Sequence, residues 1–352
     1  MKRIFTKIYA WALLFLLVAG LSVVVAFAWL RLDDLINAVV GVAAAFILAP
    51  TFHELGHYIF ATANSLKVVY CKFFCFRYYE QAGKKRFGFA NPFAADETQV
   101  LPIGSEDMSS RAYGYTIGGL VVGGALLAVV LVANIVCWCL GATAFSALGM
   151  LPYVAYHFFL NLLPAEYPSG KTDALVAKGL KEGEPTEATM LNVMRIHGGL
   201  QEGKRFAELE EAWYFSAPQL AEDEPLYAAI LEARYAYFLE KEEYEKAFDC
   251  LKRIRSAGEY LSEREVLALE RNLAYLCLLG GNDEVLKTAV KNAEEYWQSE
   301  DVAIKRTLAL YMQKCGEAER AALLIEQAEA LLQEEPILGI KKHEMLLLSR
   351  IK

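Results

Sequence analysis

The sequence predicts an α-helical polytopic membrane protein: four transmembrane helices and a small β-hairpin at the membrane interface, followed by a soluble, all-helical second half. Three observations support this prediction: long uncharged apolar stretches, a hydrophobic fraction of 55% over 352 residues, and an uneven distribution of charge. Soluble chains contain about 45–50% apolar residues, so the excess is expected to face lipid. Residues 1–173 carry 12 basic and 10 acidic side chains, whereas residues 174–352 carry 23 and 33. This acidic balance argues against a nucleic-acid-binding protein.

Four apolar segments are long enough to cross a bilayer core of about 30 Å, which takes about 20 helical residues. We expect spans at about 8–30, 35–63, 115–140 and 143–163. The last two share a 54-residue stretch between Arg111 and Glu166 in which His157 is the only side chain able to carry charge. This length requires a turn, which we place near Gly141. The first segment is longer than the apolar region of a cleaved signal peptide, so a retained anchor is expected.

Basic residues predict the orientation of these spans. Three precede the first span, one lies in the loop after it, and seven lie between residues 64 and 111. We therefore expect both termini, the long loop and the acidic second half in the cytoplasm, with the spans in the plasma membrane if the source is bacterial. Within the long loop, residues 66–90 are rich in aromatic and β-branched residues around a turn at Gln81–Lys84. This pattern predicts the β-hairpin.

The second half, residues 185–352, has the periodicity of amphipathic helices. Three similar helix–turn–helix stretches contain Ala236, Ala274 and Ala309 at spacings of 38 and 35 residues, close to the 34-residue tetratricopeptide period. We predict a tetratricopeptide-like helical-repeat domain that could bind a cytoplasmic protein partner. An ordinary helical bundle is the alternative.

One motif carries chemistry: His53-Glu54-Leu55-Gly56-His57. Residues four apart share a helix face, so His53 and His57 can bind one zinc ion, and Glu54 can serve as the general base for a zinc-bound water. The motif lies near the end of a predicted transmembrane helix, where ionisable residues are costly and usually functional. The alternative is a polar helix end without a metal.

A catalytic zinc needs a third protein ligand. The candidate segment runs from Asn161 to Asp173, where the fourth predicted span ends, and the even number of spans between the two motifs brings them to one membrane depth. Glu166 and Asp173 are its two carboxylates. We favour Asp173, because it is expected at the start of the following helix, where a carboxylate is stabilised by the helix dipole. His157, one turn before Asn161, is a packing residue or a neighbour of the site.

Here the sequence resembles the site-2 protease family of intramembrane zinc metalloproteases, which pairs H-E-x-x-H on one membrane helix with an Asn-x-x-Pro…Asp-Gly motif on a later one. The resemblance covers roughly residues 35–175. It implies His53, His57 and Asp173 as zinc ligands, Glu54 as base, and Asn161 as a substrate-positioning or oxyanion-stabilising residue. Asp173 follows Pro164 by nine residues where the family usually has five, so residues 168–170 read as an insertion.

The resemblance implies an intramembrane zinc endopeptidase, with one Zn²⁺ per chain, that cleaves transmembrane or juxtamembrane bonds of a membrane-protein substrate. The alternative from another functional class is a catalytically silent zinc-binding scaffold whose helical repeats recruit partners. The segment Ala165–Thr172 partly matches a phosphate-binding loop. It follows a membrane helix and contains Pro168, which lacks an amide donor, so nucleotide binding is not expected.

Overall fold

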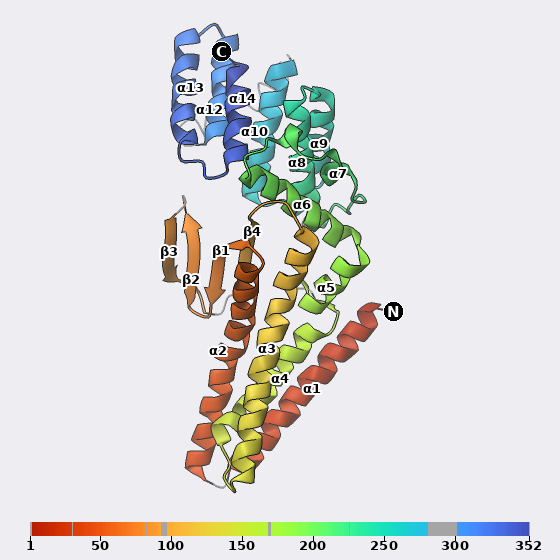
Figure 1. Cartoon of the computed structure of the whole chain (residues 1–352), viewed down its shortest axis with the longest axis vertical. Coiled ribbons are helices and arrows are strands. Elements are labelled where there is room, and N and C mark those ends of the chain that lie inside the picture. Colours follow the sequence, from red (N-terminus) through yellow and green to blue (C-terminus); the bar gives the residue numbers. More distant parts are fainter. Residues whose placement is uncertain are drawn as a thin grey trace. The chain divides into compact units, whose positions relative to one another are not determined.

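The computed structural model describes residues 2–29, 31–81, 84–92, 97–167, 170–224, 226–280 and 301–351. The chain is mostly helical and divides into two compact units (Figure 1). The first unit, the membrane-helix unit, comprises Met1–Leu101 and Asp107–Glu184. The second, the helical unit, comprises Pro102–Glu106 and Pro185–Lys352.

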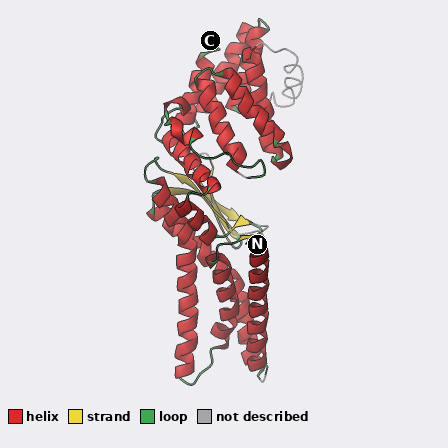
Figure 2. Cartoon of the chain, turned by 90° about the vertical axis from the view of Figure 1, so that its right-hand side faces the viewer, coloured by secondary structure: helices red, strands yellow, loops and turns green. Residues whose placement is uncertain are grey.

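The membrane-helix unit contains five helices, a four-stranded sheet and a two-stranded hairpin among its described residues. Its elements are α1 (Lys2–Ala28), α2 (Leu32–Ala63), β1 (Leu66–Phe73), β2 (Phe76–Gln81), β3 (Lys84–Phe89), β4 (Glu97–Pro102), α3 (Met108–Cys139), α4 (Phe145–Leu162), β5 (Glu166–Tyr167), β6 (Gly170–Lys171) and α5 (Asp173–Glu182). The strands lie at one end of the long helices (Figure 2).

Three of the described helices, α1, α2 and α3, are long and apolar enough to cross a membrane. All three helices carry large apolar side chains that are exposed; for example, Trp11 on α1 is 70% exposed and Trp138 on α3 is 80% exposed. The segment predicted as a fourth span does form a helix, α4, but it is shorter and includes Pro152, His157 and Asn161. It is therefore not among the three candidate spans.

The predicted hairpin at 66–90 is present as part of a larger sheet with the strand order β3-β2-β1-β4. The long aromatic run does not form one strand, because the chain reverses after β1, where Phe74 has a φ of 51°. Strands β1 and β2 are antiparallel, with Tyr70 opposite Tyr79, and β2 pairs with β3, with Tyr78 opposite Phe87. Strand β4, which lies beside β1, was not predicted from the sequence.

Glycines allow the backbones of α2 and α3 to pack closely. A Cβ atom at Gly56 would lie 2.2 Å from the carbonyl oxygen of Gly118, and one at Gly118 would lie 2.6 Å from the carbonyl oxygen of Gly56. Small residues at helix contacts allow this approach, which dispersion forces stabilise in lipid. The same contact fixes the distance between the two helices at the level of the histidines of α2.

The helical unit contains two short 3₁₀ turns and eight α-helices among its described residues. Its elements are α6 (Pro185–Gln201), η1 (Phe206–Glu208), α7 (Glu211–Phe215), α8 (Leu226–Glu240), α9 (Tyr244–Ser256), η2 (Gly258–Tyr260), α10 (Glu263–Gly280), α12 (Val302–Lys314), α13 (Ala318–Leu332) and α14 (Leu338–Ser349). The predicted repeat starts lie on α8, α10 and α12. The remainder of the second predicted repeat, from residue 281, lies outside the described residues.

Sequential packing of α8, α9, α10, α12 and α13 is the main feature of this unit. Helix α14 departs from it, because it contacts α6 and α8 as well as α12 and α13. His343 Nδ1 lies 2.7 Å from the buried carboxylate of Glu240 on α8, and Arg350 donates to the carbonyl oxygen of Leu239. In a pure solenoid each repeat contacts only its neighbours. The tetratricopeptide-like architecture therefore stays a prediction.

Candidate metal centre

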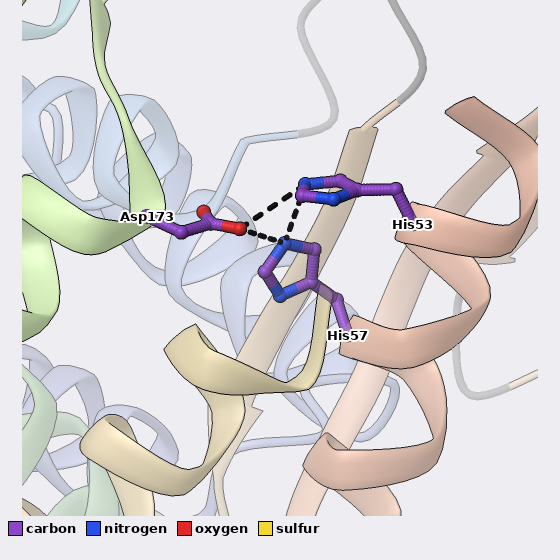
Figure 3. Close-up of side chains that lie close together, drawn as sticks. All are labelled: His53, His57 and Asp173. Carbon is purple, nitrogen blue, oxygen red and sulfur yellow. Dashed lines mark hydrogen bonds and ion pairs between the residues drawn. The ribbon is translucent and has the colours of Figure 1, made fainter. Parts of the chain in front are cut away.

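Two histidines from α2 and one aspartate from α5 converge on a single point (Figure 3). The Nε2 atoms of His53 and His57 lie 3.3 Å apart. Oδ2 of Asp173 lies 3.1 Å from Nε2 of His53 and 3.2 Å from Nε2 of His57. Both histidines are buried and Asp173 is largely buried. The four-residue spacing of the histidines places them on successive turns of one helix face, as the motif requires.

The start of α5 is fixed in place by Thr172, the residue before Asp173. The Thr172 hydroxyl donates to the carbonyl oxygen of Leu163 at 2.7 Å and accepts from the amide of Ala165 at 3.1 Å. It also accepts from the amide of Leu175 at 3.3 Å, which caps the helix. These bonds tie the end of α4 to the start of α5 across the β5–β6 hairpin, and so determine where the Asp173 carboxylate lies.

Hydrogen bonding determines which atom of His57 is free to bind a ligand. Its Nδ1 lies 3.0 Å from the carbonyl oxygen of Tyr115. A carbonyl oxygen can only accept, so Nδ1 carries the proton and, in the neutral ring, Nε2 presents a lone pair. A hydrogen bond of this kind commonly orients a metal-binding histidine.

Asp173 supplies the negative charge of the cluster. Burial by itself raises the pKa of its carboxyl, but the electrostatic influence of the adjacent imidazoles of His53 and His57 outweighs burial and holds the pKa below its ordinary value. Oδ2, the atom that faces both imidazoles, is buried without a hydrogen-bond partner. Two imidazole nitrogens and an unpartnered carboxylate oxygen at this separation form a site that could hold a metal ion.

The separations within the cluster agree with tetrahedral coordination. Zn–N and Zn–O bonds of about 2.0–2.2 Å at tetrahedral angles place neighbouring ligand atoms about 3.3–3.6 Å apart, and the three ligand atoms lie 3.1–3.3 Å apart. Small adjustments of the side chains would accommodate the ion. Three protein ligands leave a fourth position for water or substrate.

Gly119 on α3 keeps space open beside the ligand atoms. A Cβ atom at this position would lie 2.6 Å from Nε2 of His57 and 2.8 Å from Nε2 of His53. The sequence shows a run of glycines in this helix, which indicates helix packing. It does not reveal that one of them faces the histidines.

Glu54 lies beside the cluster on the same turn of α2 but is not one of the three grouped residues. Its Oε2 accepts a hydrogen bond of 2.7 Å from the hydroxyl of Thr98 on β4. A carboxylate near the metal position that is not itself a ligand has the location that a general base requires.

The other predicted residues occupy different positions. Asn161 donates its side-chain amide to the carbonyl oxygen of His157 on its own helix, at 3.2 Å. Glu166 lies exposed on β5, opposite Lys171. The ring of His157 approaches His53 edge-on, with the ring centroids 5.3 Å apart, so it is a neighbour of the site.

Comparisons of the chain with models of known protein families, with curated proteins and with solved structures give no match. The resemblance to site-2 proteases therefore stays a resemblance of motifs. What the structure itself shows is a buried His53–His57–Asp173 group able to hold a metal ion, in a unit with three helices suited to a membrane.

Proposed function

We propose that this chain is an intramembrane zinc endopeptidase of the site-2 protease type. The observation that carries the proposal is the arrangement of His53, His57 and Asp173: two residues of a five-residue helical motif and a carboxylate more than a hundred residues later share one potential metal position. The remaining ionisable residue of the motif, Glu54, is a glutamate, the side chain that a metallopeptidase uses as its base.

Zinc is the metal we propose, because two imidazoles and one carboxylate with one open position form a ligand set typical of catalytic zinc. Bound zinc would supply Lewis-acid polarisation of the scissile carbonyl and acidify water toward a pKa of about 7.

Metal binding, proton transfer and substrate contact would each be carried out by different residues of the chain. His53, His57 and Asp173 would hold the ion, and the bond from Nδ1 of His57 to Tyr115 would keep that ring oriented. Glu54 would take a proton from the attacking water and return it to the leaving amine. Asn161 is proposed to contact substrate, for which its amide would have to leave its bond to His157.

The membrane setting of the proposal includes α4 as a fourth span and both termini in the cytoplasm. The basic residues at the start of α1 and in the segment between α2 and α3 support this orientation. A single added cysteine at Asp33 is expected to react with a membrane-impermeant thiol reagent on intact cells, and one at Lys85 is not. The unsubstituted chain serves as background, and the reverse labelling pattern would rule the orientation out.

Metal removal tests the activity. The purified protein in detergent, incubated with a set of single-span membrane-protein substrates, is expected to give a cleavage product that disappears with 1,10-phenanthroline and returns with stoichiometric Zn²⁺. Bound metal measured in the same samples should change in parallel. Cleavage that survives complete metal loss would contradict the proposal, and metal binding without cleavage of any substrate would favour the zinc-binding scaffold.

A further inference from the structure

A series of hydrogen bonds links the proposed base to one of the metal-binding histidines through Thr98 and Tyr115. Thr98 Oγ1 donates to Oε2 of Glu54 at 2.7 Å. The carbonyl oxygen of Thr98 accepts from the hydroxyl of Tyr115 at 2.6 Å. The carbonyl oxygen of Tyr115 in turn accepts from Nδ1 of His57 at 3.0 Å. Since Glu54 and His57 lie on one helix, the bonds form a closed circuit through α2, β4 and α3.

The direction of each bond in this circuit follows from the donor groups. The hydroxyl of Thr98 has one proton and gives it to Glu54, so toward Cys71 it can only accept. Sγ of Cys71 lies 3.1 Å from Oγ1 of Thr98, and its S–H therefore donates. Thr98 is only 7% exposed and Cys71 is fully buried. Water thus has little access to the Thr98 hydroxyl, and the bond to Glu54 is not readily exchanged for a bond to solvent.

We propose that Thr98 is a positioning residue of the peptidase, whose hydroxyl holds the carboxylate of Glu54 in the orientation needed for proton transfer. The bond engages Oε2 and so restricts rotation of the carboxylate, and Oε1 would take the proton from the attacking water. This inference rests on the proposed function. It assigns a catalytic contribution to the sheet, through a strand that carries neither the H-E-x-x-H motif nor the third ligand.

The side chain and the backbone of Thr98 have separable roles. The bond from Tyr115 goes to the backbone carbonyl, which any residue at position 98 supplies. The bond to Glu54 comes from the side-chain hydroxyl. Thr98→Val replaces this hydroxyl by a methyl group of similar size, so it removes the bond to Glu54 and keeps the bond to Tyr115. Thr98→Ser restores the donor.

The matched control is Thr116→Val. Thr116 is also a buried threonine of the membrane-helix unit, at 5% exposure, but its hydroxyl donates to Ala112 within its own helix. We expect Thr98→Val to lower kcat about 10- to 100-fold, the range that corresponds to one lost hydrogen bond to a charged group. KM should stay within about twofold. Thr116→Val should keep kcat, and all variants should bind zinc as the unsubstituted protein does.

A second measurement asks whether Thr98 acts through Glu54. In Glu54→Asp the carboxylate is one methylene shorter and cannot keep the same bond, so adding Thr98→Val is expected to lower kcat little further. Equal fold-losses from Thr98→Val in both backgrounds would overturn the inference. So would a Thr98→Val protein with unchanged kcat, or a Thr98→Ser protein as slow as Thr98→Val. Failure of the proposed function is distinct, because the unsubstituted protein would then show no metal-dependent cleavage.

Discussion

Glu54→Gln is expected to stop cleavage while the protein keeps its fold and its metal. The amide has nearly the size of the carboxylate, and its carbonyl oxygen can still accept the hydrogen bond from Thr98. His53, His57 and Asp173 are unchanged, so zinc should remain near one per chain. What is lost is the ability to take a proton from water. Loss of a general base typically lowers the rate about 10²–10⁴-fold.

The control for this variant is His53→Ala, which should lose metal and activity together because it removes a ligand. A cleavage assay with zinc measured in the same samples separates the two outcomes. The zinc-binding scaffold makes the opposite prediction for Glu54→Gln, since a base would have no role in it. Cleavage by Glu54→Gln at the unsubstituted rate would end the peptidase proposal.

The length of the uncharged apolar stretches predicted the long helices α1, α2 and α3 well, because about 20 consecutive apolar residues are typical of a membrane-spanning helix. Their ends were less predictable. Helix α2 begins at Leu32 and α3 at Met108, earlier than the expected starts at about 35 and 115. In both helices the first turn contains charged residues, which the apolar pattern does not include. The count of four spans depended on α4, where Pro152, His157 and Asn161 interrupt the apolar pattern. In the sheet, β4 was missed because Glu97–Pro102 has too few apolar residues to form a strand signal.

The candidate site was predictable where spacing alone determines geometry. The positions of His53 and His57 on one face follow from the helical repeat. The choice between Asp173 and Glu166 depends on how the chain turns after α4, and there the capping bonds of Thr172 decide the geometry. Thr98 had no sequence signal at all, because its contact with Glu54 exists only after β4 has joined the sheet beside β1, the strand that packs against α2.

Gly119→Ala is expected to abolish metal binding although it adds only a methyl group. Within a helix this substitution ordinarily stabilises by about 0.5–1 kcal/mol, so local propensity predicts a gain. At position 119 the new Cβ would lie 2.6–2.8 Å from three imidazole atoms of His53 and His57. Helix α3 could relieve this contact only by moving away from α2, and that movement would break the close Gly56–Gly118 packing. The imidazoles must therefore shift, and the ligand geometry is lost.

The matched control is Gly123→Ala, one turn further along the same helix. A Cβ atom there would have its nearest neighbours, His53 Nδ1 and Phe158 Cδ2, at 3.9 Å, which is an ordinary contact. We expect Gly123→Ala to hold zinc normally, Gly119→Ala to hold as little as Asp173→Ala, and Glu166→Ala to resemble the unsubstituted protein. Metal analysis of the four purified variants, with helicity checked by circular dichroism, provides the comparison. Normal zinc in Gly119→Ala would mean that the ion does not sit among His53, His57 and Asp173, because the added methyl group leaves the imidazoles no room to coordinate it there.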